Sequence, residues 1–173
     1  MRKAVFFDRD GVLNVDKSYL WRIQDFEWVD GAKKALAYVA KAGYMSIVVT
    51  NQSGVARGYY TEEDVRLLHE WMCQEAAKAG GPIAAVYYCP YLPGAPVPQY
   101  DRQSDWRKPA PGMVLQAARE HDIDLSRSFM IGDMPRDVEC GERAGMKGYL
   151  FSGGSLLTFV QKIIQERNQR ESI

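Results

Sequence analysis

Short apolar runs alternate with longer segments of helical periodicity along this chain. The apolar runs predict buried β-strands at residues 4–7, 46–50, 83–88, 128–131 and 147–151. Apolar positions at helical spacing predict helices at residues 31–42, after Thr61, at 111–120, up to Ala144 and after Ser155. This alternation is typical of βαβ units. It predicts a Rossmann-like α/β fold with a mainly parallel sheet of about five strands and helices on both faces.

Two irregular stretches interrupt the pattern. Residues 15–28 carry four aromatic side chains, and residues 90–111 form a loop with six prolines. A loop this long inside a compact domain is usually functional or tied to another part of the protein. Neither a repeat nor a linker divides the chain, so we expect a single domain over residues 1–173. Its polar tail, residues 166–173, is expected to fray.

The charge balance argues against binding through bulk electrostatics. Lys plus Arg and Asp plus Glu both number 22 in the 173 residues, which disfavours a nucleic-acid or anionic-membrane partner. No apolar stretch is long enough for a membrane span, and no signal peptide precedes the first strand, so we expect a cytoplasmic protein. We also expect a monomer. The three cysteines lack metal-ligand spacing and are expected to be free thiols.

Polar residues follow four of the predicted strands. They are Asp8 and Asp10 after the first strand, Thr50, Asn51, Gln52 and Ser53 at the end of the second, Arg107 and Lys108 in the loop after the third, and Asp133 and Asp137 after the fourth. The carboxyl ends of parallel strands share one edge of the sheet, where ligands bind in open α/β folds. We therefore expect these groups to converge.

The types of these residues indicate phosphoryl transfer. Carboxylates are the ligands that Mg²⁺ prefers, and Asp133 is a candidate metal ligand. Asp8, the first residue after its strand, is the candidate nucleophile that would form an aspartyl phosphate. Asp10 would act as general acid and base. The Thr50 hydroxyl and the Lys108 ammonium would hold the phosphate oxygens.

Each candidate also has a plain structural alternative: a turn for Asp8 and Asp10, a β-branched strand residue for Thr50, or a solvated surface position for Arg107 and Lys108. The order of all four motifs along the chain favours the catalytic interpretation. For Asp137, capping of the following helix and an auxiliary acidic role both stay open. His69 and His121 lie in helical segments away from the strand ends, and we assign them no catalytic part.

The motifs together resemble those of a known superfamily. The chain is similar to the haloacid dehalogenase (HAD) phosphohydrolases in four motifs. They are Asp8-x-Asp10-Gly, Thr50-Asn51, Lys108-Pro and Gly132-Asp133-x-x-x-Asp137. Longer strings resemble the D-glycero-D-manno-heptose-1,7-bisphosphate 7-phosphatases. They are Asp8-Arg-Asp-Gly, residues 50–58, Tyr87-Tyr-Cys-Pro90 and residues 107–113. The phosphatase half of histidinol-phosphatase proteins is a near relative.

The resemblance implies further roles. In that family the segment matching Asp16, Lys17, Ser18 and Tyr19 contacts substrate, and the segment matching residues 50–53 holds phosphate and substrate. The residue matching Arg107 recognises the distal phosphate, and the one matching Lys108 steadies the transferring phosphate. Mg²⁺ is held by Asp8, Asp133 and the backbone carbonyl of Asp10. Many HAD enzymes carry a cap domain between the first two motifs, but residues 15–28 are too few to form one.

The sequence departs from this family in two places. The family holds a structural zinc with a Cys-x-His and a Cys-x-Cys pair, where this chain has Cys89-Pro-Tyr91 and Ser104-Asp-Trp106. We therefore predict no structural zinc, and expect the loop to be held by its prolines and by packing of Tyr91, Leu92 and Trp106. Met134 stands where the family often has Lys, which leaves the substrate open.

The sequence thus predicts a magnesium-dependent phosphomonoesterase for a phosphorylated sugar, with a heptose 1,7-bisphosphate as the leading substrate. Histidinol phosphate and nucleic-acid 3′-phosphate ends are alternatives within the same chemistry, and the neutral charge weighs against the latter. A non-enzymatic phosphate-sensing domain is an alternative of another class. Asp10 argues against it, because a pure acceptor needs no second acid–base carboxylate. The sugar configuration and the preferred anomer stay open.

Overall fold

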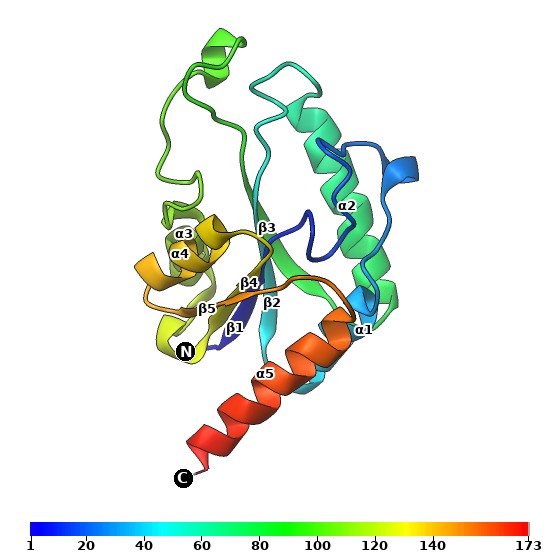
Figure 1. Ribbon diagram of the computed structural model, residues 1–173, viewed down its shortest axis with the longest axis vertical. Helices are drawn as coiled ribbons and strands as arrows, with labels where there is room; N and C mark the ends of the chain where they lie inside the picture. Colours follow the sequence, from blue (N-terminus) through cyan, green and yellow to red (C-terminus); the bar gives the residue numbers. More distant parts are fainter. Residues whose placement is uncertain (173) are drawn as a thin grey trace.

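The computed structural model, which describes residues 1–172, contains one five-stranded sheet (Figure 1). The strands are β1 (Ala4–Phe7), β2 (Met45–Asn51), β3 (Ile83–Cys89), β4 (Phe129–Gly132) and β5 (Lys147–Leu150). All neighbours pair in parallel, in the order β3-β2-β1-β4-β5. The predicted α/β fold is confirmed.

Helices cover both faces of the sheet. They are α1 (Ala32–Lys41), α2 (Glu62–Lys78), α3 (Gly112–His121), α4 (Pro135–Arg143) and α5 (Leu156–Glu171). One apolar cluster joins the sheet to α1, α2 and α5, and a second joins it to α3 and α4. Figure 1 shows these two groups on opposite sides of the strands. Among the described residues, no helix is both long and apolar enough to cross a membrane.

The apolar run of β1 is explained by its central position between these layers. Val5 and Phe7 pack into the cluster with α1 and α5, whereas Ala4 and Phe6 pack into the cluster with α3 and α4. Successive side chains of a strand point to opposite faces, so a strand covered on both faces is apolar throughout. Polar residues begin where β1 leaves the two layers, at Asp8.

Helix α2 begins directly after Thr61, as predicted, and Thr61 caps its N-terminus. The Thr61 hydroxyl accepts a hydrogen bond from the Asp64 backbone N–H (3.1 Å), and the Asp64 carboxylate accepts one from the Thr61 N–H (2.9 Å). This reciprocal arrangement is a capping box, which satisfies two backbone donors at the start of a helix. It fixes where the chain after β2 turns back along the sheet.

The C-terminal segment differs from our expectation. We expected fraying from Glu166, but α5 continues to Glu171. Arg167 explains part of the difference, because its guanidinium donates a hydrogen bond to the Ser128 carbonyl (3.3 Å) and lies over the Phe129 ring (4.9 Å). The polar end of the helix is thus attached to the start of β4.

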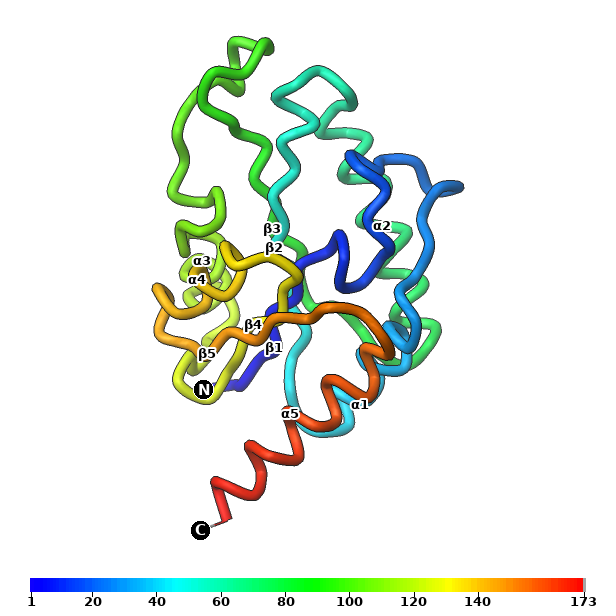
Figure 2. The backbone as a smooth tube through the Cα atoms, in the orientation of Figure 1, coloured from blue at the N-terminus to red at the C-terminus, as the bar shows by residue number. Residues whose placement is uncertain are grey.

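The long connections gather at the carboxyl edge of the sheet. Figure 2 shows the chain after β2 and the chain after β3 rising together, while the N-terminus and the end of α5 lie toward the opposite end. Residues 15–28 form only a short 3₁₀ turn, Ile23–Asp25, within the segment between β1 and α1. No separate cap domain is formed by the described residues, as predicted, and the carboxyl edge stays open.

Candidate active site

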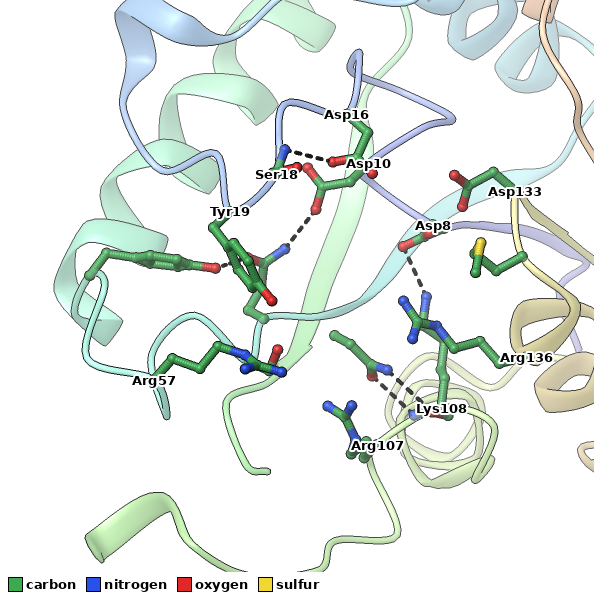
Figure 3. Close-up of a pocket in the computed structure, with 15 residues that line it drawn as sticks. Asp8, Asp10, Asp16, Ser18, Tyr19, Arg57, Arg107, Lys108, Asp133 and Arg136 are labelled. Atoms are coloured by element: carbon green, nitrogen blue, oxygen red, sulfur yellow. Dashed lines mark hydrogen bonds and ion pairs between the residues drawn. The ribbon is translucent and has the colours of Figure 1, made fainter. Parts of the chain in front are cut away.

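A polar cavity of about 330 Å³ lies at the carboxyl edge of the sheet, within the size range of small-molecule sites (Figure 3). It brings together most of the candidates named from the sequence. Those that line it are Asp8, Asp10, Asp16, Ser18, Tyr19, Asn51, Gln52, Ser53, Arg107, Lys108 and Asp133. Residues from four strand ends therefore converge, as the parallel topology requires.

Two candidates do not line this cavity. The Thr50 hydroxyl accepts a hydrogen bond from the amide of Gln52 (2.9 Å), so Thr50 contacts a residue of the lining and not the cavity itself. Lys17 is directed elsewhere, since its ammonium donates to the Asp25 carbonyl (2.9 Å) and pairs with Glu27 (3.4 Å). Nothing in this geometry gives Lys17 a contact with a ligand in the cavity.

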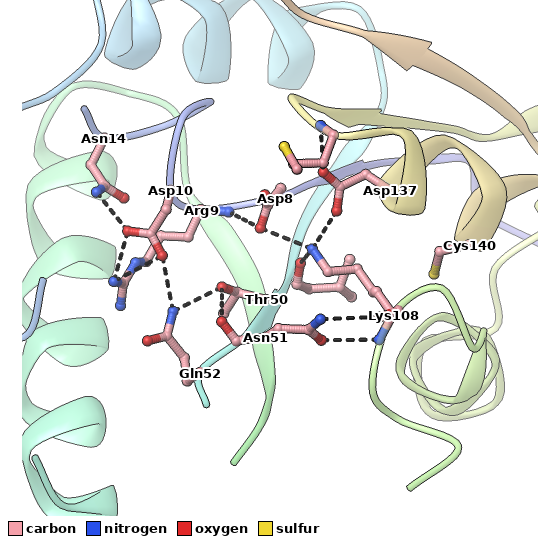
Figure 4. Close-up of polar contacts among 12 residues, drawn as sticks. Asp8, Arg9, Asp10, Asn14, Thr50, Asn51, Gln52, Lys108, Asp137 and Cys140 are labelled. Carbon is pink, nitrogen blue, oxygen red and sulfur yellow. Dashed lines mark hydrogen bonds and ion pairs between the residues drawn. The ribbon is translucent and has the colours of Figure 1, made fainter. Parts of the chain in front are cut away.

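Lys108 is a buried cation between two carboxylates (Figure 4). Its ammonium lies 2.9 Å from Asp8 Oδ1 and 2.7 Å from Asp137 Oδ1, and it donates to the Val49 carbonyl (2.9 Å). Burial lowers the pKa of Lys108, but Asp8 and Asp137 outweigh burial and hold the pKa above its usual value. The side chain therefore stays charged at the base of the cavity.

Asp137 makes both a helix-capping contact and an ion pair at the site. Its Oδ2 accepts a hydrogen bond from the Met134 N–H at the start of α4 (3.1 Å), while Oδ1 pairs with Lys108. The side chain is fully buried. Asp137 thus caps the helix and also holds the Lys108 ammonium.

Asn51 orients the backbone of Lys108. Its amide nitrogen donates to the Lys108 carbonyl (3.2 Å), and its amide oxygen accepts from the Lys108 N–H (3.0 Å). The Lys108–Pro109 peptide bond is cis. This two-bond contact joins the end of β2 to the end of the long loop, and it aims the Lys108 side chain into the sheet edge.

Asp8 and Asp133 form a pair of carboxylates suited to a divalent cation. Together with Asp137 they offer oxygens that all lie within 4.8 Å of one another. Burial raises the pKa of Asp8 to about 7, with Lys108 opposing and Asp137 adding to the rise. Burial and then Asp137 also raise the pKa of Asp133. Both oxygens of Asp137 are engaged, by Lys108 and by the Met134 N–H, whereas Asp8 is engaged by Lys108 only through Oδ1. The Asp8 and Asp133 carboxylates would therefore be the ones that Mg²⁺ stabilises in their charged forms.

Gly11 makes room for this pair. Its φ of +85° lies in the left-handed region that favours glycine, and a Cβ there would overlap the Asp133 carboxylate. The glycine of the first motif therefore allows the loop after β1 to pass directly beside the end of β4. This explains why the two acidic motifs can share one site.

Asp10 is held on both of its oxygens (Figure 4). Arg9 Nη2 donates to Oδ1 (2.9 Å) and Oδ2 (3.2 Å). Asn14 also donates to Oδ1 (3.0 Å), and Gln52 to Oδ2 (3.2 Å). Burial raises the pKa of Asp10, but the Arg9 charge and these hydrogen bonds outweigh burial and hold the pKa below its usual value. Asp10 is ionised, and its orientation follows these hydrogen-bond donors.

Arg9 is held in turn by His69 of α2. The guanidinium Nη1 lies 3.1 Å from His69 Nε2, and both side chains are buried. Burial and the Arg9 charge lower the pKa of His69 to about 3. The imidazole is therefore neutral at neutral pH.

This neutral histidine predicts a loss of stability in acid. Between about pH 6.5 and about pH 3 the unfolded chain binds a proton at His69 that the folded chain does not. The free energy of unfolding should fall with pH there by up to about 1.4 kcal/mol per unit. Urea unfolding at about pH 7 and about pH 5 should show a smaller fall for His69→Gln than for the wild type. The wild-type fall should persist in a His121→Gln control, and an equal fall in all three proteins would contradict the prediction.

Three arginine side chains converge on the cavity from separate elements. Arg57 follows β2, Arg107 lies in the loop after β3, and Arg136 lies in the first turn of α4 (Figure 3). Within residues 1–172, no carboxylate is within ion-pair distance of any of them. Burial lowers the pKa of Arg107, and the charges of Arg136 and Arg57 lower it further. This side of the cavity is suited to an anion.

The loop after β3 is attached to α2 through one carboxylate. Glu62, the first residue of α2, accepts hydrogen bonds from the hydroxyls of Tyr88 and Tyr100, both at 2.7 Å. The Tyr91 ring lies beside Tyr100, and Arg102 lies 3.9 Å from the Tyr91 ring centre. We expected prolines and aromatic packing to hold this loop, and Glu62 adds a polar attachment that the sequence did not indicate.

Comparisons with known proteins agree with this geometry. Residues 105–159 match a family model described as HAD-hydrolase-like. The D-glycero-beta-D-manno-heptose-1,7-bisphosphate 7-phosphatase of Rhodopseudomonas palustris is 40% identical over 165 residues, which are 95% of this chain and 92% of the relative. The chain belongs to the heptose-bisphosphate phosphatase family of HAD hydrolases. The resemblance stated from its motifs is thereby confirmed.

Two further relatives support the family membership. The D-glycero-alpha-D-manno-heptose-1,7-bisphosphate 7-phosphatase of Burkholderia mallei is 46% identical over 83% of this chain and 76% of its own. The solved structure of D,D-heptose 1,7-bisphosphate phosphatase from B. bronchiseptica, complexed with magnesium and phosphate, superposes with a TM-score of 0.81. It is 28% identical and covers 95% of this chain and 99% of its own. Family members therefore include proteins named for either anomer.

Several residues at the site have contacts that the sequence did not predict. Arg57 lies within the string 50–58, where the sequence favours a structural turn over a phosphate contact, and Arg136 lies three residues after Asp133, so both had a usable signal. Asn14 had none, because it reaches Asp10 only through the turn after β1. His69 lies in a helical segment to which the sequence gives no catalytic part, and its contact with Arg9 depends on the packing of α2 against that turn.

Proposed function

We propose that this protein is a magnesium-dependent phosphomonoesterase that removes the 7-phosphate of D-glycero-D-manno-heptose 1,7-bisphosphate. One observation carries the proposal: a single cavity holds both the Asp8–Lys108 pair and three arginines without carboxylate partners. The first group suits the phosphate that is transferred. The second suits another phosphate of the same molecule. A substrate with two phosphates fits this division better than one with a single phosphate.

The buried pair provides the chemistry of the transfer. A carboxylate oxygen of Asp8 attacks phosphorus, the bond to the sugar oxygen breaks, and an aspartyl phosphate forms. Lys108, which lies 2.9 Å from Asp8, compensates the negative charge of the phosphate oxygens. Mg²⁺ bound by Asp8, Asp133 and the Asp10 carbonyl would supply further positive charge and favour the ionised form of Asp8.

Asp10 is the acid–base group in this proposal. It gives a proton to the departing sugar oxygen, and later takes one from the water that hydrolyses the aspartyl phosphate. Arg9 keeps Asp10 ionised before substrate binds. A phosphate dianion beside Asp10 favours the protonated carboxyl, so we expect the proton to be taken up together with the substrate.

Arg57, Arg107 and Arg136 would bind the distal phosphate. Met134 occupies the position where the family often has Lys, and its side chain lines the cavity without charge. Arg136 lies two residues further along, in the first turn of α4, and returns a positive charge to the same wall. The departure at Met134 is therefore compatible with a bisphosphate substrate.

A panel of phosphate esters tests the proposal. We expect kcat/KM for heptose 1,7-bisphosphates to exceed that for the corresponding 7-phosphate by tenfold or more, since an arginine–phosphate contact contributes about 1.5–3 kcal/mol. The ratio should fall in Arg136→Gln, where Arg57 and Arg107 remain, and should approach one only when all three arginines are replaced by Gln. Equal kcat/KM values for all esters would contradict the proposed substrate and support only a general phosphatase activity. The absence of any turnover would favour a phosphate-sensing domain.

Removal of the metal should abolish this activity. We expect dialysis against a chelator to reduce turnover of a generic aryl phosphate to background, because Asp8 and Asp133 then lose the cation that keeps them ionised. Addition of Mg²⁺ should restore the rate. A rate that is unchanged after chelation would contradict the assignment of Asp8 and Asp133 as metal ligands.

We further propose that the loop after β3 is held without zinc. Cys89 is a buried free thiol, and Tyr91, Ser104 and Trp106 occupy the other positions of the family's ligand pairs. A single thiolate cannot form a tetrahedral zinc site, and Glu62 anchors the loop instead. Elemental analysis of the purified protein should find no zinc, whereas stoichiometric zinc would contradict this proposal.

A further inference from the structure

Arg9, between the two catalytic carboxylates of the first motif, is a fully buried arginine. Its Nη2 donates to both oxygens of Asp10 and to the Leu20 carbonyl (2.9 Å), and its Nη1 lies 3.1 Å from His69 Nε2. Asp10 is its only carboxylate partner among residues 1–172. Burying a charged side chain is costly unless its partners are well placed. The contacts of Arg9 therefore call for an explanation beyond packing.

The contact with His69 has a defined polarity. A guanidinium has donors only, so His69 Nε2 accepts the hydrogen bond and the imidazole proton is on Nδ1. His69 lies on the inner face of α2 and packs edge-on against Tyr88. The ring thus holds the guanidinium through Nη1, while Nη2 contacts Asp10.

The contact with Leu20 reaches the segment that faces substrate. Leu20 directly follows Ser18 and Tyr19, which line the cavity and have φ values of 55° and 62°. Both residues therefore have left-handed backbone conformations, which are strained for residues other than glycine. Such strain persists only where surrounding contacts hold it. The Ser18 N–H bonds to Asp16, and Arg9 holds the carbonyl at the other end.

We propose that Arg9 is a positioning residue that couples the substrate-facing segment 16–20 to the Asp10 carboxylate, and that His69 holds Arg9 in the coupling orientation. This inference rests on the proposed function, since it needs Asp10 to protonate a sugar oxygen. One guanidinium nitrogen touches both Asp10 and Leu20, so a shift of the segment moves the acid–base group with it. A sugar that seats correctly against Tyr19 thereby aligns Asp10.

Two substrates with different leaving groups distinguish this positioning role of Arg9 from a general contribution to the stability of the fold. A sugar oxygen needs a proton from Asp10 as it departs, whereas nitrophenolate leaves without one. We expect His69→Leu to lower kcat/KM on the heptose bisphosphate by about tenfold or more, with less than about threefold change on nitrophenyl phosphate. His69→Gln, which can place an acceptor where Nε2 lies, should restore the sugar-phosphate value to within about threefold. Met72→Leu on the same buried helix face is the matched control for packing.

The outcomes distinguish this inference from the proposed function. Equal losses on both substrates, or no loss on either, would overturn the coupling by Arg9. A His69→Gln protein with the same loss of kcat/KM on the sugar phosphate as His69→Leu would also overturn it. If the wild type hydrolyses another alkyl phosphate but not a heptose bisphosphate, the proposed substrate is wrong, and the same comparison with that alkyl phosphate still tests Arg9. Arg9→Lys keeps the charge but cannot reach all the acceptors, and if it folds it should show the same selective loss.

Discussion

Replacement of Asp8 by Asn should reduce turnover of any phosphate ester by about 10⁴-fold or more. The amide is close in shape to the carboxylate, but it cannot attack phosphorus to form the acyl phosphate. Lys108 would still pair with Asp137, so the base of the cavity should stay folded. The measurement is release of inorganic phosphate from an aryl phosphate at saturating Mg²⁺.

Two further variants serve as comparisons for Asp8→Asn. Asp10→Asn should also lose turnover, because the aspartyl phosphate then lacks the group that activates water. Asp122→Asn changes an exposed carboxylate away from the cavity and should leave the rate unchanged. Substantial activity in Asp8→Asn would show that another group is the nucleophile.

Replacement of Lys108 by Met should have the largest effect on stability. Asp8 and Asp137 would lose the cation that compensates both of them in a buried environment. Breaking a buried ion pair in this way costs about 3–5 kcal/mol in the free energy of unfolding. Urea unfolding near neutral pH measures the loss, and turnover should be abolished as well.

A second substitution, at Asp137, tests whether the uncompensated negative charge causes the loss of stability in Lys108→Met. In Lys108→Met/Asp137→Asn the uncompensated charge is reduced, so the double variant should be more stable than Lys108→Met alone. Lys162→Met, at an exposed position of α5, should change stability by no more than about 0.5 kcal/mol. A Lys108→Met protein as stable as the wild type would show that the pair contributes nothing to folding.

The fold could be predicted from the sequence because its local signals agree with its layers. The apolar run at Ala4–Phe7 had to be a strand covered on both faces, and Thr61 capped its helix as expected. The end of α5 could not be predicted, because the contact between Arg167 and the start of β4 joins residues far apart in the chain.

The site was predictable where it follows from topology. Asp8, Lys108 and Asp133 follow different strands, and a parallel sheet places such ends at one edge. Contacts made by side chains across layers were not predictable. The Arg9–His69 contact depends on how α2 packs, and Glu62 reaches Tyr100 only because the long loop folds back over α2.

The identity of the product tests the central claim most directly. ³¹P NMR of a reaction with D-glycero-D-manno-heptose 1,7-bisphosphate reports which ester is cleaved. The proposed function, with the 7-phosphate at Asp8 and Lys108 and the 1-phosphate at the three arginines, predicts inorganic phosphate and heptose 1-phosphate in equal amounts. Accumulation of heptose 7-phosphate, or a bisphosphate that persists unchanged, would contradict it.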